Sequence, residues 1–115
     1  MTIYALSTVE GQSGVAIIRV SGPLSKKVIN NLTGKEPKPR LATLVKIKTL
    51  KNKIIDEGLV VYFPKKQSFT GEEVAEFHIH GSTAIIETLL KELGRIKGLK
   101  PVSYTHLTLP TIYSV

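Results

Sequence analysis

The chain has 115 residues, 42% hydrophobic and 22% charged, which suits one folded domain with a single core and excludes a disordered chain. It contains no cysteine, so disulfides, thiolate chemistry and cysteine-ligated zinc are excluded. The formal net charge of +7 favours an anionic partner, although dispersed lysines are more often simply a solvated surface.

Neither end of the chain carries a pattern typical of a membrane or secreted protein. No apolar run approaches the roughly 20 residues that cross a bilayer. The first residues lack the basic segment, apolar stretch and cleavage site of a secretory signal. We therefore expect a cytoplasmic location and no membrane partner.

The first third of the chain predicts two strands followed by a helix. Residues 4–8 and 15–20 are rich in β-forming side chains and are separated by a loop with two glycines. Pro23 suits the first position of a helix, apolar residues then recur at helical spacing, and Gly34 is a natural stop. We expect a tight connection between the two strands and a helix after them.

The rest of the chain predicts a hairpin, a further strand and a second helix. Residues 35–40 contain two prolines and form an extended linker. Residues 41–50 and 54–63 are typical of a β-hairpin, and 73–80 of a fifth strand. A helix follows Gly81-Ser82-Thr83 and is expected to end at Gly98. The predicted fold is a single α+β domain with a mixed, mostly antiparallel five-stranded sheet and helices on one face.

The strand at 73–80 carries the most informative side chains. Because side chains alternate across a sheet, Glu76, His78 and His80 share one face and the apolar residues between them share the other. Three interpretations remain open: a solvated polar face, a metal site of histidine and carboxylate, or ligand recognition by Glu76. A carboxylate can accept two parallel hydrogen bonds from the adjacent N–H and amino groups of a pterin or guanine ring.

Arg19 is the second candidate, because it is the only charged residue in the apolar strand at 15–20. It either extends to solvent or binds an anion. No convincing nucleophile–base pair is evident, and the phosphate-binding pattern Gly-x-x-x-x-Gly-Lys-Ser/Thr is absent. We therefore expect neither catalytic activity nor GTP hydrolysis from this chain alone.

Several short segments match the pattern of a known family in order and spacing over residues 1 to about 100. The segments are Thr2-Ile3 with Ala5, the glycine loop through residues 14–22, 37–40, 55–59, 62–64, 68–72, Glu76 and His80-Gly81. Each alone is weak, whereas the set is highly specific. Together they resemble the N-terminal domain of the TrmE/MnmE family of tRNA-modification GTPases.

The resemblance implies a fold similar to the tetrahydrofolate-binding fold of aminomethyltransferases. It implies a homodimer that binds formyl-tetrahydrofolate near the subunit interface, and Arg19 and Glu76 match folate-contacting positions. Full-length members add a GTPase domain, which uses GTP, magnesium and potassium and is absent here. With an FAD-dependent partner enzyme they modify the wobble uridine of certain tRNAs.

The chain departs from the family pattern at its C-terminal end. We expect residues 1–101 to form the folate-binding and dimerisation domain and 102–115 to be a non-native tail, so that a third folate contact, a lysine, is missing. Two alternatives remain: a small folate-dependent one-carbon transferase, and a basic RNA-binding module without folate.

Overall fold

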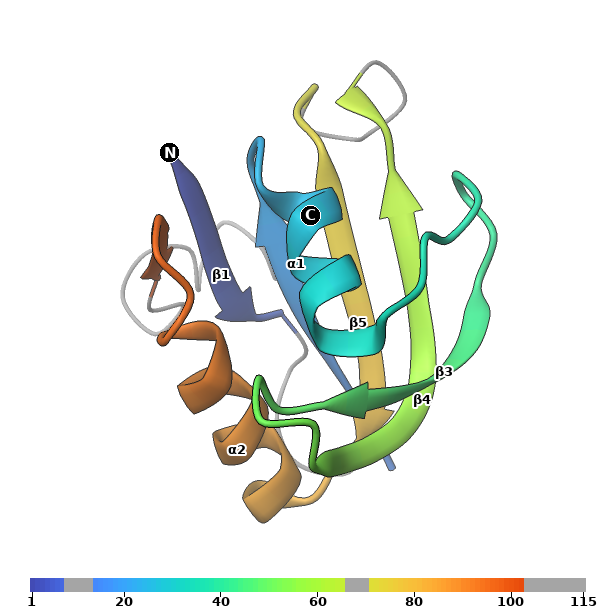
Figure 1. The fold of residues 1–115 in the computed structure, drawn as a ribbon, viewed down its shortest axis with the longest axis vertical. Helices are drawn as coiled ribbons and strands as arrows, with labels where there is room; N and C mark the ends of the chain where they lie inside the picture. Colours follow the sequence, from blue (N-terminus) through green and yellow to red (C-terminus); the bar gives the residue numbers. More distant parts are fainter. Residues whose placement is uncertain (8–13, 66–70, 103–115) are drawn as a thin grey trace, which may run out of the picture.

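The computed structural model describes residues 1–7, 14–65 and 71–102, which form six strands and two helices (Figure 1). In chain order the elements are β1 (Thr2–Leu6), β2 (Val15–Ser21), α1 (Ser25–Thr33), β3 (Thr43–Lys48), β4 (Ile54–Phe63), β5 (Val74–His80), α2 (Thr83–Leu93) and β6 (Leu99–Pro101). Residues 103–115 of the tail expected at 102–115 lie outside the described residues, so the expectation that this tail is non-native stays a prediction.

All six strands form one mixed sheet with the order β3-β4-β5-β2-β1-β6. Every neighbouring pair is antiparallel except β1 and β6, which run parallel. The prediction of five strands was therefore wrong by one. The sixth strand, β6, has only three residues, and it pairs with β1 because α2 returns the chain to that edge of the sheet. Such a short strand has no periodicity of its own to detect.

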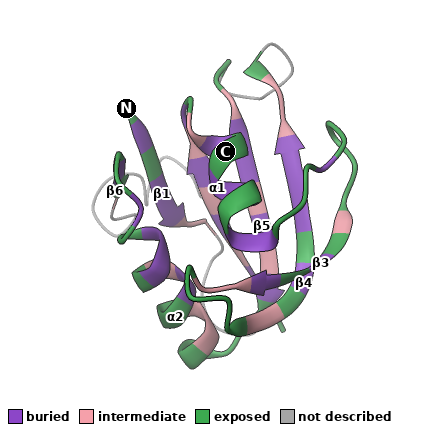
Figure 2. Ribbon diagram, viewed as in Figure 1, coloured by how far each residue is buried: buried purple, intermediate pink, exposed green. Residues whose placement is uncertain are grey.

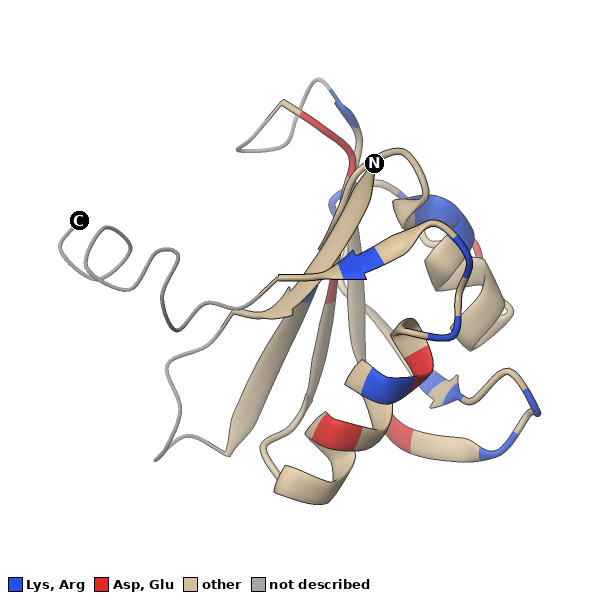
Figure 3. Ribbon diagram, turned by 90° about the vertical axis from the view of Figure 1, so that its left-hand side faces the viewer, with Lys and Arg blue, Asp and Glu red and all other residues tan. Residues whose placement is uncertain are grey.

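Both helices cover the same face of the sheet, as predicted, and within the described residues no helix covers the opposite face, which we call the open face (Figures 1 and 3). The core lies between the helices and the covered face, where alternate strand positions are buried (Figure 2). Ile18, Phe77 and Val60 come from three adjacent strands, whereas Leu32 and Leu89 come from the two helices; all five are fully buried. Burial of each such side chain contributes roughly 1.5–3 kcal/mol.

The helix boundaries differ from expectation at two of four positions. Helix α1 begins at Ser25, two residues beyond Pro23, and ends as predicted at Gly34, whose φ of 71° is left-handed. Helix α2 begins after the cap Ser82, whose side chain accepts a hydrogen bond from the Ile85 N–H. It ends at Leu93, before the predicted stop, because the chain turns there to bury Ile96 and reach β6.

The predicted hairpin is confirmed as β3 and β4, although β3 is shorter than the predicted strand at 41–50. The linker before β3 follows the same edge of the sheet, because Pro39 bridges Tyr62 in parallel beyond the end of β3. Within the described ranges, neither helix has the length and apolar character needed to cross a bilayer.

Candidate ligand site on the open sheet face

The open face of the sheet places the predicted site residues in two adjacent rows. The strand registers align Ala5, Arg19, Glu76 and Val61 in one row across β1, β2, β5 and β4. The next row contains Ile17, His78, Leu59 and Leu44. Arg19 and Glu76 are thus directly opposite each other on neighbouring antiparallel strands, surrounded by apolar side chains.

Glu76 is held by two neighbours on this face. Arg19 donates two hydrogen bonds to Glu76 Oε2, from Nε at 3.1 Å and from Nη2 at 2.8 Å. His78 Nε2 lies 3.0 Å from Glu76 Oε1, and because an ionised carboxylate only accepts, this nitrogen must carry the proton. The Glu76 side chain is 16% exposed and that of Arg19 41%, so the pair lies at the surface and is accessible to a ligand.

The hydrogen-bonding capacity of Glu76 is almost used up in this arrangement. A carboxylate offers about four acceptor positions, and Arg19 and His78 occupy three of them. A heterocycle that presents two parallel donors needs two positions. It can therefore bind Glu76 in this way only if one of the existing donors moves away.

His80 is separated from Glu76, although the sequence places them on the same face. Its Nδ1 lies 3.0 Å from Asp56 Oδ1, and its backbone N–H donates to Asp56 Oδ2 at 2.9 Å. Burial would raise the pKa of Asp56, but hydrogen bonds from the backbone and ring of His80 and from the Glu57 backbone outweigh it, and the pKa is lowered. The described part of the chain contains no group of three or more side chains arranged to hold a metal ion.

A shallow depression of about 330 Å³ lies on the open face next to Glu76. His78 connects the depression to Glu76, because it lines the depression and also contacts the Glu76 carboxylate. The floor and walls are mostly apolar, and Val15, Leu44 and Leu59 are its exposed apolar side chains. Its volume falls within the range of small-molecule sites.

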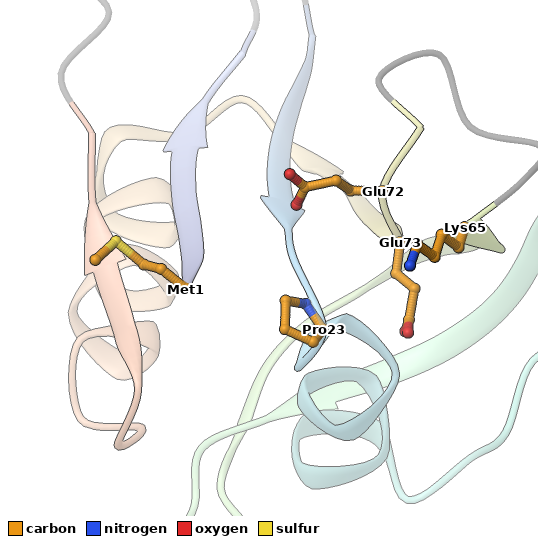
Figure 4. Close-up of a pocket in the computed structure, with 5 residues that line it drawn as sticks. All are labelled: Met1, Pro23, Lys65, Glu72 and Glu73. Atoms are coloured by element: carbon orange, nitrogen blue, oxygen red, sulfur yellow. The ribbon is translucent and has the colours of Figure 1, made fainter.

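A second depression, of about 350 Å³, lies at the opposite end of β2 and β5 (Figure 4). It is lined by Met1, Pro23, Lys65, Glu72 and Glu73. Glu73 accepts a hydrogen bond from the Tyr62 hydroxyl at 3.0 Å; burial, this bond and the nearby carboxylate charge all raise the pKa of Tyr62. Among the described residues, two carboxylates and one lysine line this depression, and this balance of charge does not favour an anionic ligand.

Comparison with known proteins identifies the family. The family model described as the GTP-binding protein TrmE N-terminus matches residues 2–105 of this chain. The chain belongs to the TrmE N-terminal family. This finding confirms the resemblance that the short segments indicated.

Relatives of this TrmE N-terminal domain include bacterial and mitochondrial proteins whose names refer to the modification of tRNA. The tRNA modification GTPase MnmE of Pelagibacter ubique is 50% identical over 112 residues, which cover 93% of this chain and 25% of the relative. The mitochondrial 5-taurinomethyluridine-[tRNA] synthase subunit GTPB3 of Danio rerio is 46% identical over 114 residues, which cover 98% of this chain and 23% of the relative. The mitochondrial tRNA modification GTPase mss1 of Schizosaccharomyces pombe is 46% identical over 104 residues, which cover 90% of this chain and 21% of the relative.

The TrmE N-terminal domain seen here thus spans about a quarter of the length of these relatives. Arg19 and Glu76, which the sequence singled out separately, are in contact, and the sequence analysis missed both this ion pair and the role of His78 in it. The register of β2 against β5 decides these contacts, and no local pattern encodes that register. Ser68, Phe69 and Thr70 of the family-like loop lie outside the described residues.

Proposed function

We propose that this chain is the folate-binding and dimerising module of a tRNA-modification GTPase that acts on the wobble uridine of tRNA. The ligand is formyl-tetrahydrofolate, and Glu76 and Arg19 are its main contacts. The observation that carries the proposal is the accessible Glu76 carboxylate, which faces Arg19 beside an apolar depression.

The chemistry of this site suits a reduced pterin. The ring presents an N–H and an amino group in parallel, which match the two oxygens of Glu76. The apolar side chains of the depression, including Leu59, provide a surface on which a flat ring can lie. The ring carbonyl oxygen beside the ring N–H would accept a hydrogen bond from a guanidinium, and Arg19 is the cation at this position.

Binding would proceed by exchange of partners. Because Arg19 and His78 fill three acceptor positions on Glu76, the ring replaces at least one donor from Arg19. Arg19 keeps its other hydrogen bond to Glu76, and the freed N–H can donate to the ring carbonyl oxygen that adjoins the ring N–H. The exchange replaces one hydrogen bond by another and keeps the two charges together, so its cost is largely offset.

The whole protein would add what this domain lacks. A GTPase domain would supply GTP hydrolysis with magnesium and potassium, and an FAD-dependent partner enzyme would complete the modification of tRNA in the cytoplasm. The names of the relatives, which include a 5-taurinomethyluridine-[tRNA] synthase subunit, support this role in tRNA modification. The names support a role as a domain of a tRNA-modification protein more strongly than the alternative of a free-standing one-carbon transferase.

The decisive experiment is calorimetric titration of the chain with formyl-tetrahydrofolate. We expect Glu76→Ala to weaken binding by about 1–3 kcal/mol, because two ligand donors lose their acceptor. Glu87→Ala, which removes an exposed carboxylate on α2, is the matched control and should bind like the unmodified chain. Equal affinities of the Glu76→Ala and Glu87→Ala variants would rule out the anchor role of Glu76.

A further inference from the structure

Nearly all of the net charge of this protein lies in one segment. Residues 35–53 contain seven of the 16 lysines and arginines but only one of the nine acidic residues, so they carry +6 of the total +7. We call the seven cations of this segment the basic edge: Lys35, Lys38, Arg40, Lys46, Lys48, Lys51 and Lys53. The remainder of the chain is almost neutral.

The fold arranges the basic edge along one side of the sheet. Lys46 and Lys48 belong to the edge strand β3, Lys51 and Lys53 to the hairpin turn that follows it, and the other three to the linker beside β4. Figure 3 shows lysines on the hairpin, which projects from the helix-covered side. All seven are exposed except Lys48, which is half-buried, and within the described ranges none pairs with a carboxylate.

The hairpin presents its lysines on a fixed backbone. Two hydrogen bonds close the turn, from the Thr49 N–H to the Lys53 carbonyl and from the Asn52 N–H to the Thr49 carbonyl. The buried Glu92 of α2 accepts a hydrogen bond from the Leu50 N–H at 2.7 Å and so holds the turn against the helix. A preorganised cationic surface loses less conformational entropy when it binds.

Protection of an edge strand from aggregation is a common reason for lysines at such a position. It accounts for Lys46 and Lys48, which lie on β3 itself. It does not account for the five cations in the linker and the turn, because these residues lie beyond the strand. An extended row of cations matches a chain of phosphates better than it matches a single anion.

A small polar depression adjoins the row. It has a volume of about 150 Å³ and lies between the end of α1 and the hairpin, where Asn30, Asn31, Asn52 and Lys48 line it. Amide side chains both donate and accept hydrogen bonds, as contacts to ribose and phosphate oxygens require. An extended row of cations flanked by amide side chains suits a ligand that repeats phosphates and ribose hydroxyls along a chain, so the surroundings of the row favour RNA.

We propose that the basic edge binds the phosphate backbone of the RNA substrate. This inference rests on the proposed role in tRNA modification, but it does not depend on folate binding. The contacts are to phosphates and ribose, so the surface positions the RNA and does not read its sequence.

The test compares two triple variants of the full chain, each of which removes three exposed lysines. The first carries Lys46→Gln, Lys51→Gln and Lys53→Gln; the control carries Lys91→Gln, Lys97→Gln and Lys100→Gln on the α2 and β6 side. Binding of a transcribed tRNA is measured by fluorescence anisotropy between 50 and 200 mM salt. We expect the first variant to bind about ten-fold or more weakly and its salt slope to fall by about 2–3, and the control to bind like the unmodified chain.

Several outcomes would overturn the proposal. These are an unmodified chain that does not bind tRNA, equal losses in both variants, or polyglutamate that competes as well as RNA at equal charge. A third variant with arginine at the same three positions should keep its affinity, which checks that charge carries the effect. Formyl-tetrahydrofolate titrations of the same proteins separate the two proposals, because the first variant should bind folate normally while Glu76→Ala should bind tRNA normally.

Discussion

At the scale of single residues, the polar side chains of β5 have different partners although they share one face. Glu76 and His78 contact each other and Arg19, whereas His80 contacts Asp56 of β4. The alternation of side chains along β5 placed Glu76, His78 and His80 on one face. Only Glu76 and His78 belong to the candidate ligand site. The third helps to join β4 to the end of β5.

This second contact makes a prediction about acid stability. Because the pKa of Asp56 is lowered in the folded state, the ionised carboxylate stabilises the fold above the ordinary aspartate pKa of about 3.9. That stabilisation is lost as the pH falls through the folded-state pKa. We expect Asp56→Asn to lower the free energy of unfolding by about 1 kcal/mol at pH 7 and to have less effect at pH 3.

Urea unfolding followed by circular dichroism at pH 7 and pH 3 measures this difference. Glu87→Gln, which changes an exposed carboxylate on α2, is the control and should unfold like the unmodified chain at both values. An Asp56→Asn variant with the same loss of stability at pH 3 as at pH 7 would mean that His80 does not stabilise the ionised carboxylate.

At the scale of elements, the close approach of β4 to β5 depends on Gly58. A β-carbon at this position would collide with the carbonyl oxygen of His78, which is backbone and cannot turn aside. Gly58 faces the core opposite Val45 of β3 and is buried. The absence of a side chain at Gly58 therefore lets β5 come close enough to place His78. His78 in turn both contacts Glu76 and lines the apolar depression.

We expect Gly58→Ala to destabilise the fold by roughly 1–3 kcal/mol, and to weaken folate binding because β5 must shift. Gly14→Ala is the control for stability, since a β-carbon at Gly14 meets no atom within 4 Å. Chemical unfolding and folate titration measure the two effects. If Gly58→Ala had the same free energy of unfolding as the unmodified chain, β4 and β5 would be able to move apart at little cost in stability.

At the scale of the whole molecule, the two faces of the sheet are unequal. One is covered by α1 and α2, whereas the other exposes Ile3, Val15, Leu44 and Leu59 around the Glu76 site. Exposed apolar groups clustered on one face are typical of an interaction surface. They support the proposal that two copies of the chain associate, and an association through this face would exclude water from the folate.

The prediction at this scale concerns the oligomeric state. We expect Leu59→Lys to shift the chain from dimer to monomer in light scattering coupled to size exclusion, because the lysine would bury a charge in the interface. Leu41→Lys, in the linker before β3, is the control for added charge at an exposed leucine and should remain dimeric. A monomeric unmodified chain at high micromolar concentration would contradict the dimer proposal.

Elements whose signals are local could be predicted from the amino-acid sequence. The apolar periodicity of the two helices, the alternation along β5 and the hairpin pattern of residues 41–63 all predicted observed elements, because each signal lies within a short stretch of the chain. The set of family-like segments also identified the TrmE N-terminal family, which the family model then confirmed.

The tertiary structure alone decided what depends on distant residues. The parallel pairing of β6 with β1, the end of α2 before Gly98 and the ion pair of Arg19 with Glu76 all join segments far apart in the chain. The gathering of the linker and hairpin cations along one edge likewise follows from the strand order. The register of the strands, and the path by which the chain comes back to pair β6 with β1, are set by the packing of the whole core. No short stretch of residues contains that information.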